Sequence, residues 1–214
     1  MQKPKIIYVF DALCGWCYGF SPVIKAVNEN YCDQFNFEVL SGGMMLGEKE
    51  GRIGLIAPYI KSAYKQVEET TGIVFGEPFL HELDKGQLYF GSEFPAIGLA
   101  VLKSHLPDQA VHLAHELQNC IYFDGKGPSD PEVYRFIAVN HGVDPDLVEK
   151  QLQEESFKQA AYYEFALSRQ LQVSGYPAAF IQTTDSKFYM IARGYADYET
   201  MELRINNVLK EIKA

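Results

Sequence analysis

The sequence has few cysteines, an excess of acidic over basic residues, and no long hydrophobic run. Only four cysteines occur in 214 residues, fewer than a secreted domain stabilised by disulfides usually carries. Lysine and arginine together number 19 against 28 aspartates and glutamates, so the formal net charge is −9. An acidic surface argues against nucleic acid or an anionic membrane as a partner. No apolar stretch approaches the roughly 20 residues that a membrane span requires.

The beginning of the chain has no recognisable secretion signal. Residues 1–5 lead directly into a short apolar run, without the long apolar segment and small-residue cleavage site of a signal peptide. We therefore expect a cytoplasmic protein. The rest of the composition, 47% hydrophobic and 22% charged, is that of a globular chain of one or two domains.

Two of the four cysteines stand close together at a predicted strand–helix junction. Cys14 and Cys17 form a Cys-x-x-Cys sequence shortly after the apolar run Lys5–Phe10. The start of a helix carries unpaired N–H groups and a partial positive charge, and both stabilise an anion. A cysteine placed there loses its proton more readily, and the thiolate is the reactive form. The pair therefore predicts a redox-active dithiol.

Two other interpretations of the cysteine pair are half of a zinc site and two structural thiols. A structural zinc site requires two further ligands, and the sequence has no second Cys-x-x-Cys and no Cys-x-x-His. We therefore expect no metal and no cofactor beyond the dithiol itself, with glutathione or another thiol as a candidate electron partner. Cys120 continues a helical apolar pattern and is predicted to be a core residue. Cys32 falls near the end of the first predicted helix, where we assign it no role.

The hydrophobic pattern predicts strands at both ends of the chain and helices between them. The expected strands cover residues 6–10, 36–40, 178–183 and 187–192. The expected helices cover 15–31, 55–71, 94–104, 108–123, a segment beginning at a capping sequence in 129–132, a short segment from 144, 157–170 and 197–213. We thus expect one domain from residues 1–47 and 172–214, interrupted by a helical insertion from residues 48–171.

This order of elements, together with three short motifs, resembles a known family. The order is that of an α/β protein with a thioredoxin-like fold and a large all-helical insertion. The motifs are the segment Asp11–Pro22 around the cysteines, Gly42-Gly43 after the second strand, and Gly175-Tyr-Pro177 before the third. On these residues the chain resembles the DsbA-like branch of the thioredoxin superfamily, above all its FrnE-like and "predicted protein-disulfide isomerase" members. The resemblance implies a protein-disulfide oxidoreductase or isomerase, acting on proteins or small molecules that carry a disulfide or a thiol.

The resemblance also implies roles for individual residues. Cys14 attacks a disulfide, and Cys17 then attacks Cys14 to release the substrate. Pro177 is expected in the cis form opposite Cys14, as thioredoxin-like proteins keep it. The backbone of Tyr176 would then pair with an extended substrate segment, like an added strand.

Two residues near the motif allow more than one interpretation, and a third departs from the family pattern. Trp16 either provides an apolar landing surface for substrate or packs against the helical block. Asp11 either accepts a proton during exchange or caps the loop. Tyr8 stands where many thioredoxins and DsbA-like proteins bury an acid, six residues before the first cysteine, so that acid is predicted to be absent here.

The sequence also allows two other functions. The first is a glutathione-dependent transferase or isomerase of the kappa class, which shares this fold but normally places serine at the active position. The second is a non-enzymatic binding module whose dithiol senses oxidation. The sequence predicts neither the oligomeric state nor the direction of exchange, because direction depends on the reduction potential relative to the compartment.

Overall fold

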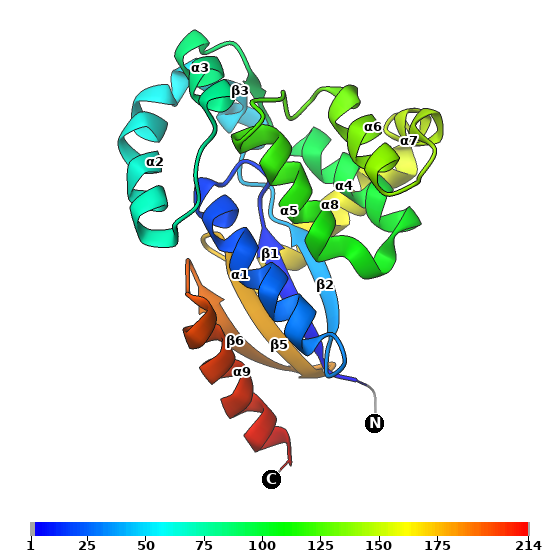
Figure 1. Ribbon diagram of the computed structural model, residues 1–214. Coiled ribbons are helices and arrows are strands. Elements are labelled where there is room, and N and C mark those ends of the chain that lie inside the picture. Colours follow the sequence, from blue (N-terminus) through cyan, green and yellow to red (C-terminus); the bar gives the residue numbers. More distant parts are fainter. Residues whose placement is uncertain (1–2, 214) are drawn as a thin grey trace.

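A four-stranded sheet lies at the centre of the computed structural model, which describes residues 3–213 (Figure 1). Its strands are β1 (Lys5–Phe10), β2 (Asn36–Ser41), β5 (Ala178–Thr184) and β6 (Lys187–Arg193), arranged in the order β2-β1-β5-β6. β1 pairs in parallel with β2 and antiparallel with β5, and β5 pairs antiparallel with β6. The two ends of the chain therefore build one sheet, and the predicted thioredoxin-like fold is confirmed.

Helices cover both faces of this sheet, which explains why β1 is almost entirely apolar. On one face lie α1 (Gly15–Tyr31) and α9 (Tyr198–Lys213), as Figure 1 shows. There Ile6 and Tyr8 of β1 are buried in the same cluster as Phe20 of α1. On the opposite face Ile7 and Val9 pack in a smaller cluster with residues near the end of α8 (Glu155–Gln170). Full burial of each large aliphatic side chain contributes about 1.5–3 kcal/mol.

α1 runs unbroken through a proline. Pro22 has no N–H, so the carbonyl of Tyr18, four residues earlier, lacks its helical partner. The hydroxyl of Ser21 donates to that carbonyl at 2.8 Å. The same hydroxyl oxygen lies 2.8 Å from Nδ1 of His115 on α5 (Ala110–Tyr122). A side chain thus replaces the missing main-chain bond and joins α1 to α5.

Residues between β2 and β5 form the predicted helical insertion. Besides α5 and α8, its helices are α2 (Ala57–Thr71), α3 (Glu77–Lys85), α4 (Glu93–His105), α6 (Pro131–Asn140) and α7 (Pro145–Gln151). Short 3₁₀ turns occupy Gly47–Lys49, Ile53–Leu55 and Pro107–Gln109.

The insertion departs from the prediction in two places. It contains α3, a separate helix that the hydrophobic pattern does not predict. It is also not wholly helical, because β3 (Gly51–Arg52) and β4 (Tyr89–Phe90) pair antiparallel. Strands of two residues are too short to show an alternating pattern. The exact domain boundaries at residues 47 and 172 stay a prediction.

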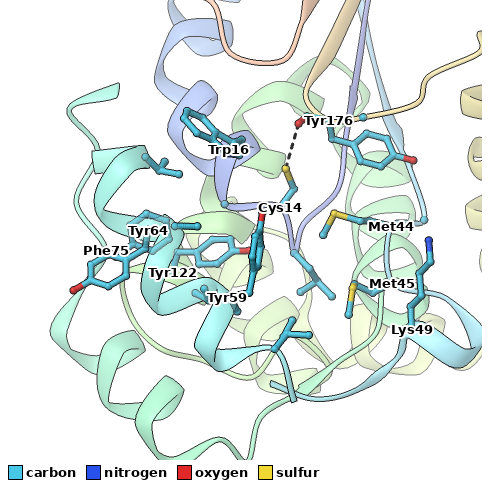
Figure 2. A pocket seen from close by; sticks show the side chains of 18 of the residues that line it. Cys14, Trp16, Met44, Met45, Lys49, Tyr59, Tyr64, Phe75, Tyr122 and Tyr176 are labelled. Atoms are coloured by element: carbon cyan, nitrogen blue, oxygen red, sulfur yellow. Dashed lines mark hydrogen bonds between the residues drawn. The ribbon is translucent and has the colours of Figure 1, made fainter. Parts of the chain in front are cut away.

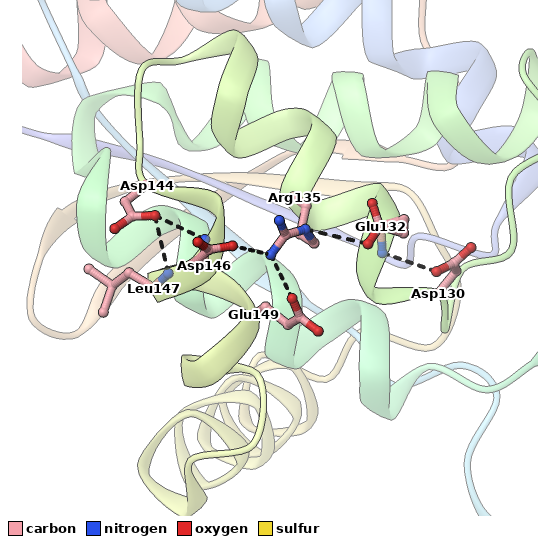
Figure 3. Close-up of polar contacts among 7 residues, drawn as sticks. All are labelled: Asp130, Glu132, Arg135, Asp144, Asp146, Leu147 and Glu149. Carbon is pink, nitrogen blue, oxygen red and sulfur yellow. Dashed lines mark hydrogen bonds and ion pairs between the residues drawn. The ribbon is translucent and has the colours of Figure 1, made fainter.

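The starts of α6 and α7 are capped by aspartates (Figure 3). Asp130 accepts a hydrogen bond from the main chain of Glu132 at 3.0 Å, and Asp144 caps α7 in the same way. The cap of α6 is therefore Asp130, and the expected capping sequence beginning at Ser129 is wrong by one residue. Arg135 of α6 joins the two helices through the carboxylates of Asp146 and Glu149 on α7, and it also pairs with Glu132 of its own helix.

A buried ion pair fixes the insertion to the sheet. Nζ of Lys103 on α4 lies 2.5 Å from Oε1 of Glu164 on α8, with the two side chains 15% and 13% exposed. Lys103 also donates to the carbonyl of Val39 at 2.8 Å, and Glu164 accepts from the N–H of Ser41 at 2.9 Å. Both charged groups are thereby bonded to the end of β2. Among residues 3–213, no helix has the length and apolarity needed to cross a membrane.

Candidate active site

Cys14 is the residue that caps the start of α1. Its backbone is extended, with φ −96° and ψ 110°, and its Sγ accepts a hydrogen bond from the N–H of Cys17 at 3.2 Å. The predicted placement of the first cysteine at a helix start is therefore confirmed. An N–H bond and the positive end of the helix dipole both stabilise a sulfur anion at this position.

The loop before β5 comes to face this sulfur. The Tyr176–Pro177 peptide bond is cis, as the resemblance implies. The carbonyl of Tyr176 lies 3.7 Å from Sγ of Cys14 and accepts a hydrogen bond from the thiol (Figure 2). Residues separated by more than 160 positions in sequence thus meet at one point, where a substrate bonded to Cys14 would lie beside the Tyr176 main chain.

The two cysteines differ in access. Cys14 is only 7% exposed, yet it lines a pocket of about 570 Å³. Cys17, one helical turn further along, is fully buried and does not line that pocket. A small molecule or a side chain that enters the pocket can reach Cys14 only. This arrangement would let Cys14 attack a substrate disulfide and let Cys17 attack Cys14 afterwards.

The protonation of Cys17 depends on Cys14. Burial, followed by the hydrogen bond with Cys14 and the charge of Cys14, holds the pKa of the Cys17 thiol well above its usual range. Cys17 therefore holds its proton more tightly than an exposed thiol does. A disulfide on Cys14 carries no negative charge, so its formation removes one of the causes that raise the pKa of Cys17.

Asp11 makes the contacts of a loop cap. Its carboxylate is 1% exposed, and Oδ1 accepts from the N–H of Leu13 and the hydroxyl of Ser92, both at 3.0 Å. Its Oδ2 accepts from the N–H of Met44 at 2.7 Å. Burial raises the pKa of Asp11, while these hydrogen bonds act in the opposite direction. One carboxylate thereby fixes the Cys14 loop to the loop that follows β2.

Tyr8 occupies a buried position close to the thiols. Its side chain is 1% exposed, and its hydroxyl has no hydrogen-bond partner among the described residues. Burial, and then the charges of Cys17 and Cys14, hold its pKa well above the usual range for tyrosine. A neutral phenol therefore stands at the position where the family resemblance led us to look for a buried acid.

Trp16 is half-buried beside Cys14 and lines the pocket. Its ring centroid lies 6.4 Å from that of Tyr195, which precedes α9. This aromatic partner belongs to the C-terminal part of the chain, while Trp16 also lines the pocket together with residues of the helical insertion. The position on the pocket wall is consistent with one of the two alternatives, a landing surface for substrate.

Gln118 is a buried residue of this region that the sequence did not reveal. It lies on α5 and is fully buried. In the amide orientation that satisfies both of its polar atoms, it donates to the carbonyl of Cys17 and accepts from the N–H of Tyr18, each at 3.2 Å. A single glutamine on an amphipathic helix carries no sequence signal of such a role.

The remaining cysteines and histidines lie elsewhere. Cys120 is 1% exposed, as predicted, and burial raises its pKa to about 12. Cys32 is exposed at the end of α1. His115 is bonded to Ser21 of α1 and to Asn119 of its own helix, so it joins α5 to α1. No cluster of three His, Cys, Asp or Glu side chains suited to a metal ion occurs in residues 3–213.

The fold and the cysteine site define a thioredoxin-like protein of the DsbA type. The family model for the DSBA-like thioredoxin domain matches residues 5–206. The chain therefore belongs to the DSBA-like thioredoxin domain family. No curated protein matches this sequence.

Solved structures share the whole fold at low sequence identity. A Nitrosomonas europaea protein, provisionally described as a protein disulfide isomerase, has a TM-score of 0.85 at 23% identity, covering 98% of this chain and 99% of its own. The cytosolic disulfide reductase DsbM from Pseudomonas aeruginosa has a TM-score of 0.81 at 20% identity, covering 98% and 100%. A 2-hydroxychromene-2-carboxylate isomerase has a TM-score of 0.68 at 12% identity, covering 98% of each chain. At these identities the likeness concerns the fold alone.

Proposed function

We propose that this protein is a thiol–disulfide oxidoreductase in which Cys14 attacks the substrate and Cys17 completes the exchange. The observation that carries the proposal is the arrangement of the two sulfurs. Cys14 caps a helix, faces the Tyr176 carbonyl and lines a pocket, whereas Cys17 is buried behind it.

The exchange has two balanced steps. The Cys14 thiolate attacks one sulfur of a substrate disulfide, so a bond forms between Sγ and that sulfur while the other sulfur leaves as a thiolate and takes up a proton. Cys17 then loses its proton, and its thiolate attacks Sγ of Cys14. A Cys14–Cys17 disulfide forms and the second substrate sulfur leaves as a thiol. The substrate gains two electrons and the protein loses two, which an external thiol such as glutathione restores.

The neighbouring residues serve these steps by position. The Tyr176 main chain pairs with the substrate segment next to the attacked sulfur, and Pro177 holds that main chain opposite Cys14. Trp16 offers an apolar surface beside the sulfur. Asp11 keeps the loop in place through its three hydrogen bonds.

The test is a disulfide-reduction assay with a protein disulfide such as that of insulin. We expect Cys14→Ser to abolish turnover, because no sulfur remains to attack. Cys17→Ser should accumulate a mixed disulfide on Cys14 that mass spectrometry detects. Cys32→Ser, on the exposed end of α1, serves as the matched control and should retain activity. Unchanged turnover in Cys14→Ser contradicts the proposal.

The wild type and the same variants also distinguish the proposed function from the two alternatives. Saturable binding of glutathione in a calorimetric titration, without turnover of any disulfide, would favour a glutathione-dependent transferase or isomerase. A partner response that depends on Cys14, without turnover, would favour a redox-sensing module. The cytoplasmic location stays a prediction, tested by fractionating cells that express the full chain.

A further inference from the structure

We propose that the pocket beside Cys14 selects small disulfides that carry an aromatic group and a negative charge. This inference rests on the proposed function, because it concerns what the Cys14 sulfur attacks. It adds a substrate class, and it assigns the selection to residues of the helical insertion and of the segment that joins it to β2.

The first argument is the size and the lining of the pocket. Its volume of about 570 Å³ lies in the range of small-molecule sites, which is about 300–1,000 Å³. Figure 2 shows a group of aromatic rings on one side of Cys14, and Met44, Met45 and the Tyr176 ring on the other. Rings bind flat apolar groups, and thioethers adapt to irregular shapes. The aromatic side is formed by Tyr59, Tyr64, Phe75 and Tyr122.

The second argument is the charge at the pocket. Among the described residues that line it, Lys49 is the one that carries a charge, and no acidic side chain lines it. Lys49 is exposed and takes part in no ion pair within residues 3–213. It stands on the methionine side, across from the aromatic wall (Figure 2). In a protein of net charge −9, an unpaired lysine at the edge of an apolar pocket favours an anionic group on the ligand.

These two features fit one kind of ligand. Its aromatic part lies among the rings of α2 and α5, its disulfide reaches Cys14, and its carboxylate lies near Lys49. Ala63 on α2 also lines the pocket and is half-buried, so a larger side chain there would fill the space that the ligand needs.

The test measures single-turnover reduction by pre-reduced protein with no other thiol present. All proteins carry Cys32→Ser, because Cys32 is exposed and would react by itself. The probes are the disulfide of 4-mercaptophenylacetate, the disulfide of its neutral amide, and hydroxyethyl disulfide. The first two have the same size and similar thiol leaving groups, so a difference between them reports charge. A protein with Cys14→Ser gives the background rate.

Two variants with matched controls test the two features. Lys49→Gln should lower the second-order rate constant about fivefold for the carboxylate and leave the amide within about twofold. Lys65→Gln, an exposed lysine of α2 outside the pocket lining, should change neither. Ala63→Phe should slow both aryl disulfides at least about tenfold and leave hydroxyethyl disulfide within about twofold. Ser62→Phe, the exposed neighbour outside the lining, should slow none of them.

The outcomes separate this inference from the proposed function. Equal effects of Lys49→Gln on the carboxylate and the amide overturn the charge selection. Aryl rates that Ala63→Phe leaves unchanged overturn the pocket as the substrate site. If the protein with intact Cys14 reduces hydroxyethyl disulfide no faster than the Cys14→Ser background, the proposed function itself fails. Circular dichroism and thermal melting of each variant identify any loss of folding.

Discussion

Asp11 connects three segments through a single buried carboxylate. Its oxygens accept from the main chains of Leu13 and Met44 and from the hydroxyl of Ser92. Each buried donor left without a partner costs about 1–3 kcal/mol. The same burial disfavours the ionised carboxylate, so the residue combines a favourable set of hydrogen bonds with an unfavourable charge.

This combination predicts a pH dependence for Asp11→Asn. Burial raises the pKa of Asp11 above its value in the unfolded chain, so the folded protein holds the proton more tightly. The carboxyl group therefore contributes most to stability in acid, and that contribution declines as the pH rises from about 4. The stability of wild type relative to Asp11→Asn should fall as the pH rises above about 4. Urea unfolding at a series of pH values from about 4 upward measures it, and a wild type that gains stability over Asp11→Asn as the pH rises contradicts the raised pKa.

Single residues of the site differ in how far the sequence reveals them. Cys14 and Cys17 are evident from spacing, and their position at a helix start follows from the strand before them. Gln118 and Lys49 carry no signal in the sequence, because their relation to Cys14 arises only when α5 and the loop after β2 fold against α1. Tyr8 was recognised as a departure from the family, but its unpartnered hydroxyl required the structure.

At the scale of elements, the end of β2 and the loop before β5 fit each other closely. The Tyr176 hydroxyl donates to the carbonyl of Gly42 at 2.7 Å. A Cβ at position 42 would lie 2.2 Å from the Tyr176 ring. Glycine is needed here because an aromatic ring covers its main chain, and its own φ is not the reason.

Gly42→Ala should therefore displace the Tyr176 ring and, with it, the carbonyl that faces Cys14. We expect the rate of disulfide reduction to fall about tenfold and the protein to lose about 1–3 kcal/mol of stability. Adding Tyr176→Thr should restore the lost stability, because the obstructing ring is then gone. Gly127→Ala, where an added Cβ meets ordinary contacts at 3.7 Å and 3.8 Å, is the control. Full activity and stability in Gly42→Ala would show that the ring moves at no cost.

Most elements were predictable, whereas α3, β3 and β4 were not. The four sheet strands show apolar runs or alternation, α1 shows helical spacing, and all five occur close to where they were predicted. β3 and β4 form because the chain near Gly51 and the chain near Tyr89 are brought together by helices that lie between them. A pairing of that kind leaves no local pattern in the sequence.

At the scale of the whole molecule, the insertion is joined to the sheet through the Lys103–Glu164 pair. Both side chains are largely buried, and each also bonds to the main chain of β2. Such a pair is costly to break because the remaining charge has no partner and little water around it.

We expect Glu164→Ala to lower the free energy of unfolding by about 3 kcal/mol, measured by urea unfolding at neutral pH. Replacing both partners, Lys103→Met with Glu164→Leu, should recover part of this loss because no buried charge is left behind. Asp84→Ala breaks the exposed pair with Lys61 and should leave stability almost unchanged. A Glu164→Ala protein as stable as wild type would show that the insertion is held by its apolar contacts alone.

The part of the architecture that was predictable is the part that the family motifs indicate. The cysteine motif and the late Gly-x-Pro indicated which strands share a sheet. How the insertion docks depends on contacts such as Lys103–Glu164, between residues about 60 positions apart, for which a single sequence gives no signal.

The fit between Gly42 and Tyr176 has a consequence for how relatives of this protein can diverge. A relative that has a side chain at position 42 should have a smaller residue than tyrosine at position 176. The two sites are therefore expected to vary as a pair, and the identity of one should be readable from the other across sequences that preserve this geometry.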